Sequence, residues 1–161
     1  MFNTKYGLEQ AVLNGTKTRT WRADKKPRYE VGEVVAIKQK YSDLDETWRV
    51  AKGIFYGDCY LCTEYQAGWN NKMFVKNELM PHKIKITGIK QCRLQDITEE
   101  ECLNEGIYKF AGYRMFNFDN SGLPWYDTAK EAFAALINKL NGKDYWESNP
   151  DGYAYEFELV K

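Results

Sequence analysis

The sequence predicts an α+β fold, a small mixed β-barrel decorated by about three helices. Two observations support this prediction. Short β-branched or alternating segments are separated by turn residues, and amphipathic segments begin at caps and end at glycine. Strands and helices do not alternate regularly, which disfavours a doubly wound sheet. A length of 161 residues fits a single domain, 1–161, on the usual range of about 100 to 200 residues.

The N-terminal half predicts one helix and one strand. Apolar residues recur at helical spacing after Thr4, and Gly15 lies just past the end of that run. Val34–Ile37 is a β-branched run bounded by glycine, which predicts a buried strand. Residues 41–82 mix aromatic, glycine and charged residues, and we expect strands and long loops there.

Two strands are expected in the second half. Ile84–Thr87 alternates apolar and polar residues, and Ile89 follows a glycine suited to a bulge. The last strand has apolar side chains on one side, namely Tyr153, Tyr155, Phe157 and Leu159.

Two capping boxes predict the other helices. Thr98 and Glu101 form the first box, and Gly106 ends that helix. Thr128 and Glu131 form the second box, before Gly142. The apolar face of this last helix comprises Ala132, Phe133, Leu136, Ile137 and Leu140.

Charge and hydropathy exclude several classes of protein. The chain has 23 Lys plus Arg and 23 Asp plus Glu, so it lacks the basic excess of non-specific duplex binders. Any nucleic-acid contact must therefore be local. No apolar run is long enough to span a membrane, and the N-terminus lacks the apolar stretch of a signal peptide. We expect a cytoplasmic protein with no membrane partner.

The cysteines do not predict a metal site. Cys59 and Cys62 have the spacing of zinc ligands, but there is no second such pair and His82 is the only histidine. Reduced thiols are the favoured interpretation in the cytoplasm, and no metal is expected. No G-x-G-x-x-G or Walker A sequence occurs, so no cofactor is expected either.

Residues 15–22, GTKTRTWR, are the segment richest in potential chemistry. If a strand begins after Gly15, Thr20 and Arg22 share one face and can line a pocket, which Lys17 can join only from the bend. Desolvation and the like charge of Arg22 would lower the pKa of such a lysine and make it a general base. Thr20 would be the nucleophile that this base activates. The alternative is a solvated basic strand edge.

Glu105 is the second candidate, because it lies in the last turn of its predicted helix. A negative charge at a helix C-terminus is unfavourable by about 0.3 to 1 kcal/mol. Such a break of a stability rule is typical of functional sites, although an exposed glutamate tolerates the position.

The segment 15–22 resembles the G-x-K-x-x-[TE]-x-R signature of the ASCH family, small domains with a PUA-like β-barrel. Residues 74–106 are similar to the central segment of ASCH proteins that phages and prophages often encode. Residues 146–150, WESNP, are similar to the W-x-x-N-P segment that precedes the last strand of those proteins. The resemblance implies a PUA-like fold for this chain.

The best-defined ASCH relatives are bacterial amidohydrolases that remove the acetyl group of N4-acetylcytidine. The resemblance implies catalytic roles for Lys17, Thr20 and Glu105, with Glu101 and Glu99 as competitors for the carboxylate. Lys17 would deprotonate Thr20, Thr20 would attack the acetyl carbonyl, and Arg22 or backbone amides would stabilise the oxyanion. Those enzymes are much shorter, so residues 41–80 and 107–145 are insertions here.

Two other functions stay open at this point. PUA-like barrels commonly recognise RNA or modified bases, which implies a nucleoside or single-stranded RNA as partner. Trp21, Trp69, Trp125 and Tyr126 are the aromatic residues available for stacking, although packing is their commoner role. The basic residues that could face phosphates are Arg19, Arg22, Lys25, Lys26 and Arg28. Some ASCH proteins cleave single-stranded RNA, but the motif has no nearby histidine for a His-based mechanism.

Overall fold

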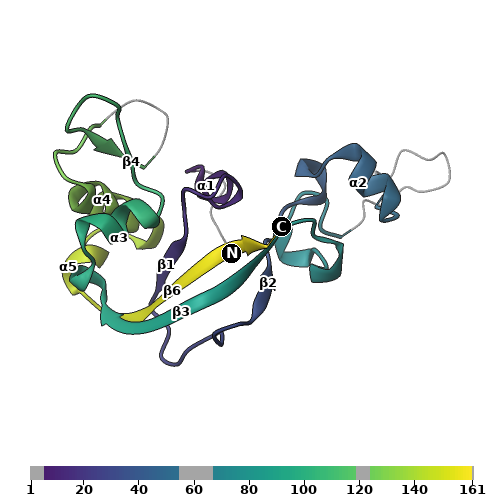
Figure 1. Cartoon of the computed structure of the whole chain (residues 1–161), viewed down its shortest axis with the longest axis horizontal. Coiled ribbons are helices and arrows are strands. Elements are labelled where there is room, and N and C mark those ends of the chain that lie inside the picture. The colour runs from purple at the N-terminus through teal and green to yellow at the C-terminus, as the bar shows by residue number, and fades with distance from the viewer. Residues whose placement is uncertain (1–5, 55–66, 119–123, 161) are drawn as a thin grey trace. The chain divides into compact units, whose positions relative to one another are not determined.

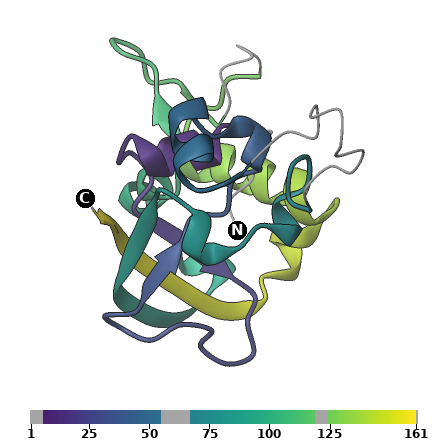
Figure 2. The same cartoon turned by 90° about the vertical axis from the view of Figure 1, so that its right-hand side faces the viewer.

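A computed structural model describes residues 6–54, 67–118 and 124–160. It has the predicted α+β class, with a curled antiparallel half-barrel sheet of four strands and a few helices (Figure 1). The sheet order is β1-β6-β3-β2. Its strands are β1 (Arg19–Arg22), β2 (Val34–Ala36), β3 (Lys83–Arg93) and β6 (Asp151–Val160). The long strands β3 (teal) and β6 (yellow) run side by side and curve (Figure 2).

The strand predicted at Val34–Ile37 exists as β2, but none of its three residues is buried; only Ile37, just past its end, is, at 2% exposed. Val34 is 52% exposed, and Val35 and Ala36 are half-buried. The reason is its place at an edge of the sheet, where only β3 pairs with it. Ile86 donates its N–H to Glu33 O at 2.9 Å and accepts from Gly32 N–H at 2.8 Å just before β2 begins. A β-branched run alone does not distinguish an edge strand from a central one.

Both capping boxes are confirmed. In α3 (Glu99–Asn104) the Thr98 side chain accepts from Glu101 N–H, and the Glu101 carboxylate accepts from Thr98 N–H. Thr128 and Glu131 do the same for α4 (Ala129–Asn141). Leu140 was expected on the buried face of α4, but it is 37% exposed in the last turn.

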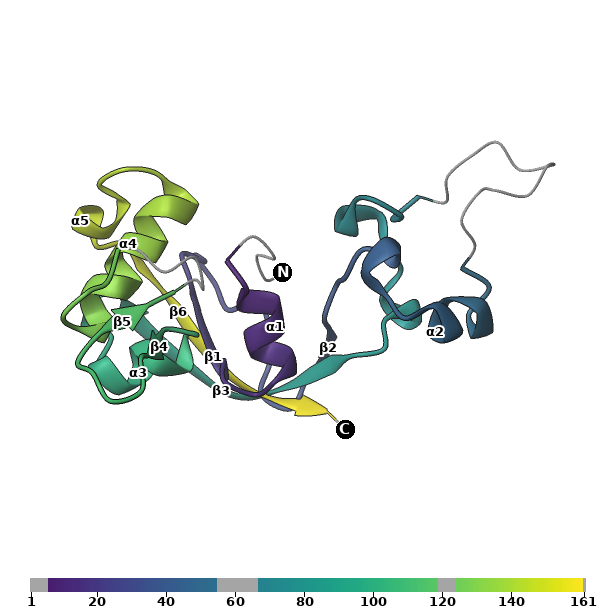
Figure 3. The ribbon, with the colours of Figure 1, turned by 90° about the horizontal axis from the view of Figure 1, so that it is seen from above.

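The other helices and a hairpin complete this part of the chain. Helix α1 (Leu8–Leu13) is the first predicted helix, and it lies beside β1 (Figure 3). Helix α5 (Tyr145–Ser148) and the two-stranded sheet of β4 (Tyr108–Lys109) and β5 (Phe116–Asn117) were not expected. The described residues therefore contain five α-helices rather than about three. A core of apolar side chains packs α3 and α4 against Trp21 and Ala154 of the sheet.

The segment 41–82 differs most from its prediction. Its described residues contain no strand. They form α2 (Glu46–Ala51) and three 3-10 helices, η1 (Tyr41–Asp43), η2 (Lys72–Phe74) and η3 (Asn77–Leu79). A fourth 3-10 helix, η4 (Leu94–Asp96), follows β3 outside this segment. Helix α2 is capped by Asp45, whose side chain accepts from Trp48 N–H. A second core lies here and comprises Tyr41, Leu44, Ile54, Trp69, Val75 and Met80.

The chain divides into two compact units. Unit 1 comprises residues 1–2, 35–84 and 160–161, and unit 2 comprises residues 3–34 and 85–159. Each unit contains one of the two apolar cores. The single domain expected from the length stays a prediction, because two compact units can still unfold as one cooperative domain.

Candidate functional site

Strand β1 places the residues of the signature on alternate faces. Arg19 and Trp21 are buried, and Thr20 and Arg22 are half-buried. The register pairs Thr20 with Tyr155 and Arg19 with Glu156 on the neighbouring strand β6. Because side chains alternate along a strand, Arg19 and Thr20 point to opposite faces of the sheet.

Lys17 lies at the bend between α1 and β1. Its N–H donates to Ala11 O at 2.8 Å, and the next N–H, that of Thr18, donates to Asn104 O at 2.9 Å. Gly15 allows the bend, because its φ of +79° is costly for other residues. These bonds fix the start of β1 against the C-terminus of α3.

The Lys17 ammonium contacts Glu105 twice. Lys17 Nζ donates to Glu105 Oε2 at 2.7 Å and to the Glu105 carbonyl oxygen at 2.6 Å. The side chains are only 3% and 5% exposed, so this is a buried ion pair. Glu105 is the C-cap of α3, where its charge alone would be unfavourable. The ammonium compensates for that charge and satisfies a helix-end carbonyl.

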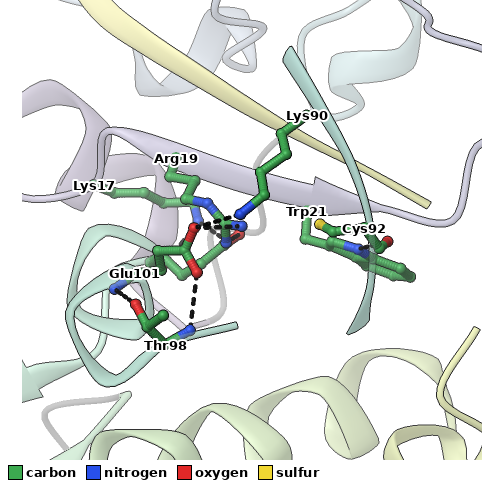
Figure 4. Close-up of polar contacts among 8 residues, drawn as sticks. Lys17, Arg19, Trp21, Lys90, Cys92, Thr98 and Glu101 are labelled. Atoms are coloured by element: carbon green, nitrogen blue, oxygen red, sulfur yellow. Dashed lines mark hydrogen bonds and ion pairs between the residues drawn. The ribbon is translucent and has the colours of Figure 1, made fainter. Parts of the chain in front are cut away.

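Arg19 joins the Lys17–Glu105 pair to a second glutamate. Its guanidinium lies 3.4 Å from Glu105 Oε1 and 3.3 Å from Glu101 Oε1. The other Glu101 oxygen accepts from Thr98 N–H at 2.8 Å and closes the capping box. Figure 4 shows Arg19 and Lys90 converging on the Glu101 carboxylate, with Lys90 at 3.9 Å.

Burial sets the electrostatics of the cluster. Desolvation lowers the pKa of Lys17 from its usual 10.5, and the nearby charges of Arg22 and Arg19 lower it further. The charge of Glu105 and its hydrogen bond oppose that shift without cancelling it. The direction is the one that the sequence predicts for a lysine beside Arg22.

Gly106 shapes the wall behind Lys17. Its φ is +100°, in the region that favours glycine. A Cβ there would lie 3.2 Å from Leu8 Cδ2 and 3.5 Å from Lys17 Cδ. The end of α3 therefore favours a glycine for its backbone, and a Cβ there would also crowd Leu8 while making an ordinary contact with the lysine stem.

Arg22 acts on this cluster through its charge, which lowers the pKa of Lys17, whereas Thr20 does not join it. Both lie on the face of β1 opposite Arg19, and within the described residues no hydrogen bond links the Thr20 hydroxyl to Lys17 or Glu105. The face of Thr20 is also that of Tyr155, whose ring is fully buried and whose hydroxyl donates to Asp24 Oδ2 at 3.1 Å. The structure thus brings Lys17 and Glu105 into contact and leaves Thr20 apart from them, and the catalytic roles of all three residues stay predictions.

The tryptophans of the predicted stacking set are mostly buried. Trp21 is 8% exposed in the core of unit 2, and its indole N–H donates to Cys92 O at 3.3 Å (Figure 4). Trp69 is also 8% exposed, in the core of unit 1, with the Arg49 guanidinium 4.9 Å from its ring centroid. These positions are those of packing residues.

Two of the basic residues predicted to face phosphates are already engaged in ion pairs within the chain. Arg19 is 2% exposed among the glutamates, and Arg28 Nη2 lies 2.6 Å from Asp24 Oδ1. Lys25 and Lys26 are exposed, and Arg22 is half-buried. Sequence reasoning missed the engagement of Arg19 by Glu101 and Glu105. The available signal was that Arg19 follows Lys17 by two residues and therefore shares its side of the strand.

Neither metal ligands nor a membrane helix are found in the part of the chain that the structure describes. There, no group of three or more His, Cys, Asp or Glu side chains could hold a metal ion. Cys59 and Cys62 lie outside the described residues. Within the same residues no helix is both long and apolar enough to cross a membrane.

No family model matches the chain, and neither the curated proteins nor the solved structures contain a match.

Proposed function

We propose that the chain is an ASCH-type, PUA-like domain that recognises a nucleoside and hydrolyses a linear amide on its base. The observation that supports this proposal is the buried ion pair of Lys17 and Glu105, 2.7 Å apart. It joins the lysine of the signature to the glutamate for which the resemblance implies a catalytic role. The proposed partner is a free nucleoside or a single-stranded RNA that contains this nucleoside.

The pair can transfer protons in both directions. A buried ammonium with a lowered pKa gives up its proton more readily than an exposed one, and the neutral amine that results is a base. Glu105 Oε2 lies within hydrogen-bond distance and can accept that proton or return it to the leaving amine. Lys17 and Glu105 therefore carry the proposed acid–base chemistry.

The nucleophile in this proposal is Thr20 or a water molecule. The resemblance implies Thr20, whose hydroxyl would need to meet the Lys17 amine once substrate is bound. A water activated by the same amine would give the same products. Thr20→Val separates the two, because it keeps the shape of the side chain and removes only the hydroxyl.

Hydrolysis of N4-acetylcytidine by the purified chain, followed chromatographically, tests the proposal. We expect turnover by the wild type and none by Lys17→Met or Glu105→Gln, with circular dichroism showing that each variant is folded. Lys90→Met is the matched control, because Lys90 approaches the same cluster from an exposed position and should leave turnover unchanged. Unchanged turnover by Lys17→Met would remove Lys17 from the mechanism, and an inactive wild type would contradict the hydrolase.

A non-catalytic module for single-stranded RNA is the second candidate. It is favoured by the separation of Thr20 from the Lys17–Glu105 pair, since binding needs no nucleophile. Lys25 and Lys26 would contact phosphates beside Arg22. Lys25→Ala/Lys26→Ala should then weaken RNA binding and flatten its salt dependence. A wild-type affinity that does not change with salt would argue against phosphate contacts, and a denaturing gel of the same RNA would report any cleavage.

A further inference from the structure

Unit 1 contains a pocket that the proposed function does not use. It has a volume of about 420 Å³ and lies between the segment after β2, helix α2 and the residues just before β3. Leu44, Trp48 and Pro81 form its apolar walls. A cavity of this size suits a small molecule, for which volumes of about 300 to 1,000 Å³ are usual.

Gln39 lines this pocket and has an unmatched acceptor. The residue is only 7% exposed, and its Oε1 has no hydrogen-bond partner among the described residues. Its backbone N–H lies 3.3 Å from the Met80 sulfur, so the backbone anchors the residue while the amide oxygen stays unpaired. Buried polar atoms are nearly always paired, so an orphaned oxygen at a pocket indicates a missing donor.

Two carboxylates add further acceptors. Asp45 Oδ1 accepts from Trp48 N–H at 3.2 Å, and its second oxygen has no partner within the described part of the chain. Asp43 lies 3.9 Å from Lys40, a loose pair with both side chains more than a third exposed. Thr47 and His82 are the remaining polar residues of the lining. The pocket therefore presents two carboxylates and the unpaired Gln39 oxygen, while Thr47 and His82 can donate as well as accept.

Trp48 can contact a ligand with its ring but not with its indole N–H. Its indole N–H is already bonded to Leu79 O at 3.0 Å. Lys52 Nζ lies 4.9 Å from the ring centroid, so the indole already makes one cation–π contact within the chain. A flat ligand can use the aromatic surface for stacking and for cation–π attraction.

We propose that this pocket binds a small flat organic cation, an amidinium or guanidinium group on an apolar body. Its N–H groups supply the donor that Gln39 Oε1 lacks and place positive charge beside the Asp43 and Asp45 carboxylates, which already accept from Ser42 and from Trp48 N–H. A planar fork of N–H groups fits a carboxylate with two parallel hydrogen bonds. Its apolar body packs between Trp48, Leu44 and Pro81. The proposal is independent of the Lys17–Glu105 site.

Titration of the full chain with benzamidine tests the proposal, with benzamide and benzoate as neutral and anionic controls of the same shape. We expect benzamidine to bind at least about tenfold more tightly than benzamide and benzoate not to bind, because only the cation complements the acceptors. In nuclear magnetic resonance spectra the Trp48 indole and Gln39 amide signals should shift with benzamidine. Equal binding of benzoate, or no shift at these two residues, would overturn the proposal.

Four variants locate the ligand. Asp43→Asn and Asp45→Asn should each weaken benzamidine binding several-fold, and Asn still caps α2 in the second variant. Glu46→Gln is the matched control, a carboxylate of the same helix that does not line the pocket. Gln39→Leu should weaken binding while raising the melting temperature, because it removes the unpaired oxygen. A Gln39→Leu protein that binds as the wild type does would contradict the site.

Discussion

Lys17 combines a structural and a proposed chemical role in one ammonium group. Its bond to the Glu105 carbonyl caps α3, and its bond to the carboxylate forms a buried ion pair. Capping alone would require only the carbonyl contact. The carboxylate makes the site costly to assemble and sensitive to the loss of either partner.

Removal of one partner should destabilise the chain strongly. Lys17→Met leaves the Glu105 charge buried with only Arg19 at 3.4 Å, and we expect a loss of about 3 kcal/mol in the free energy of unfolding, measured with urea. Lys17→Met/Glu105→Gln should lose less than the sum of the two single variants. Lys90→Met, with a side chain 67% exposed, should change stability by less than about 0.5 kcal/mol. Additive losses would show that the pair is not coupled.

The lowered pKa of Lys17 predicts a pH dependence of stability with a definite sign. The unfolded lysine titrates near 10.5, and the folded one titrates below that value. Between the two values the unfolded state binds more protons, so stability rises with pH through this window. Below the folded pKa both states are protonated, and the full penalty of the buried charge is present.

Urea unfolding between pH 7 and 10.5 measures this effect. The free energy of unfolding of the wild type minus that of Lys17→Met/Glu105→Gln should increase with pH. Burial raises the pKa of Tyr155, which lowers stability at alkaline pH, but both proteins share this contribution and the subtraction removes it. A difference that falls as pH rises would contradict the depressed pKa.

At the scale of elements, the sequence predicts the features that local contacts decide and not those that tertiary contacts decide. The boxes of Thr98–Glu101 and Thr128–Glu131 were predictable because a cap is made by residues three positions apart. Helix α2 and the β4–β5 pair are short, and short elements depend on contacts that the sequence does not display. The edge position of β2 is likewise a property of the sheet order rather than of Val34–Ala36.

The end of α3 is the element on which the site depends most. Gly106→Ala should destabilise the chain by more than about 1 kcal/mol, because it adds strain at φ +100° and places a Cβ 3.2 Å from Leu8 Cδ2. Gly142→Ala is the matched control: φ is +113° at the end of α4, but nothing lies within 4 Å of its Cβ. Thermal unfolding should show the larger loss for Gly106→Ala. Equal losses would mean that strain alone explains both.

At the scale of the whole molecule, the site was partly predictable. The lysine and glutamate are 88 positions apart in the chain, and only the resemblance linked them before their contact was known. The strand alternation already placed Lys17 and Thr20 on different sides. In the structure Lys17 contacts Glu105 together with Arg19, whose side of β1 is opposite that of Thr20. The pocket of unit 1 had no motif, since it is built from residues that share no spacing pattern.

The two cores predict how the chain opens. Phe133 is 1% exposed in the core of unit 2, and Ile54 is 2% exposed in that of unit 1. Each change to alanine removes buried contacts and should cost about 2 to 5 kcal/mol. If the units are separate cooperative units, Phe133→Ala should speed amide hydrogen exchange in residues 85–159 and Ile54→Ala in residues 35–54, each leaving the other unit protected. Acceleration of both units by either variant would instead establish the single domain that the chain length predicts, since a cooperative domain transmits a local loss of stability to every amide that exchanges by global unfolding.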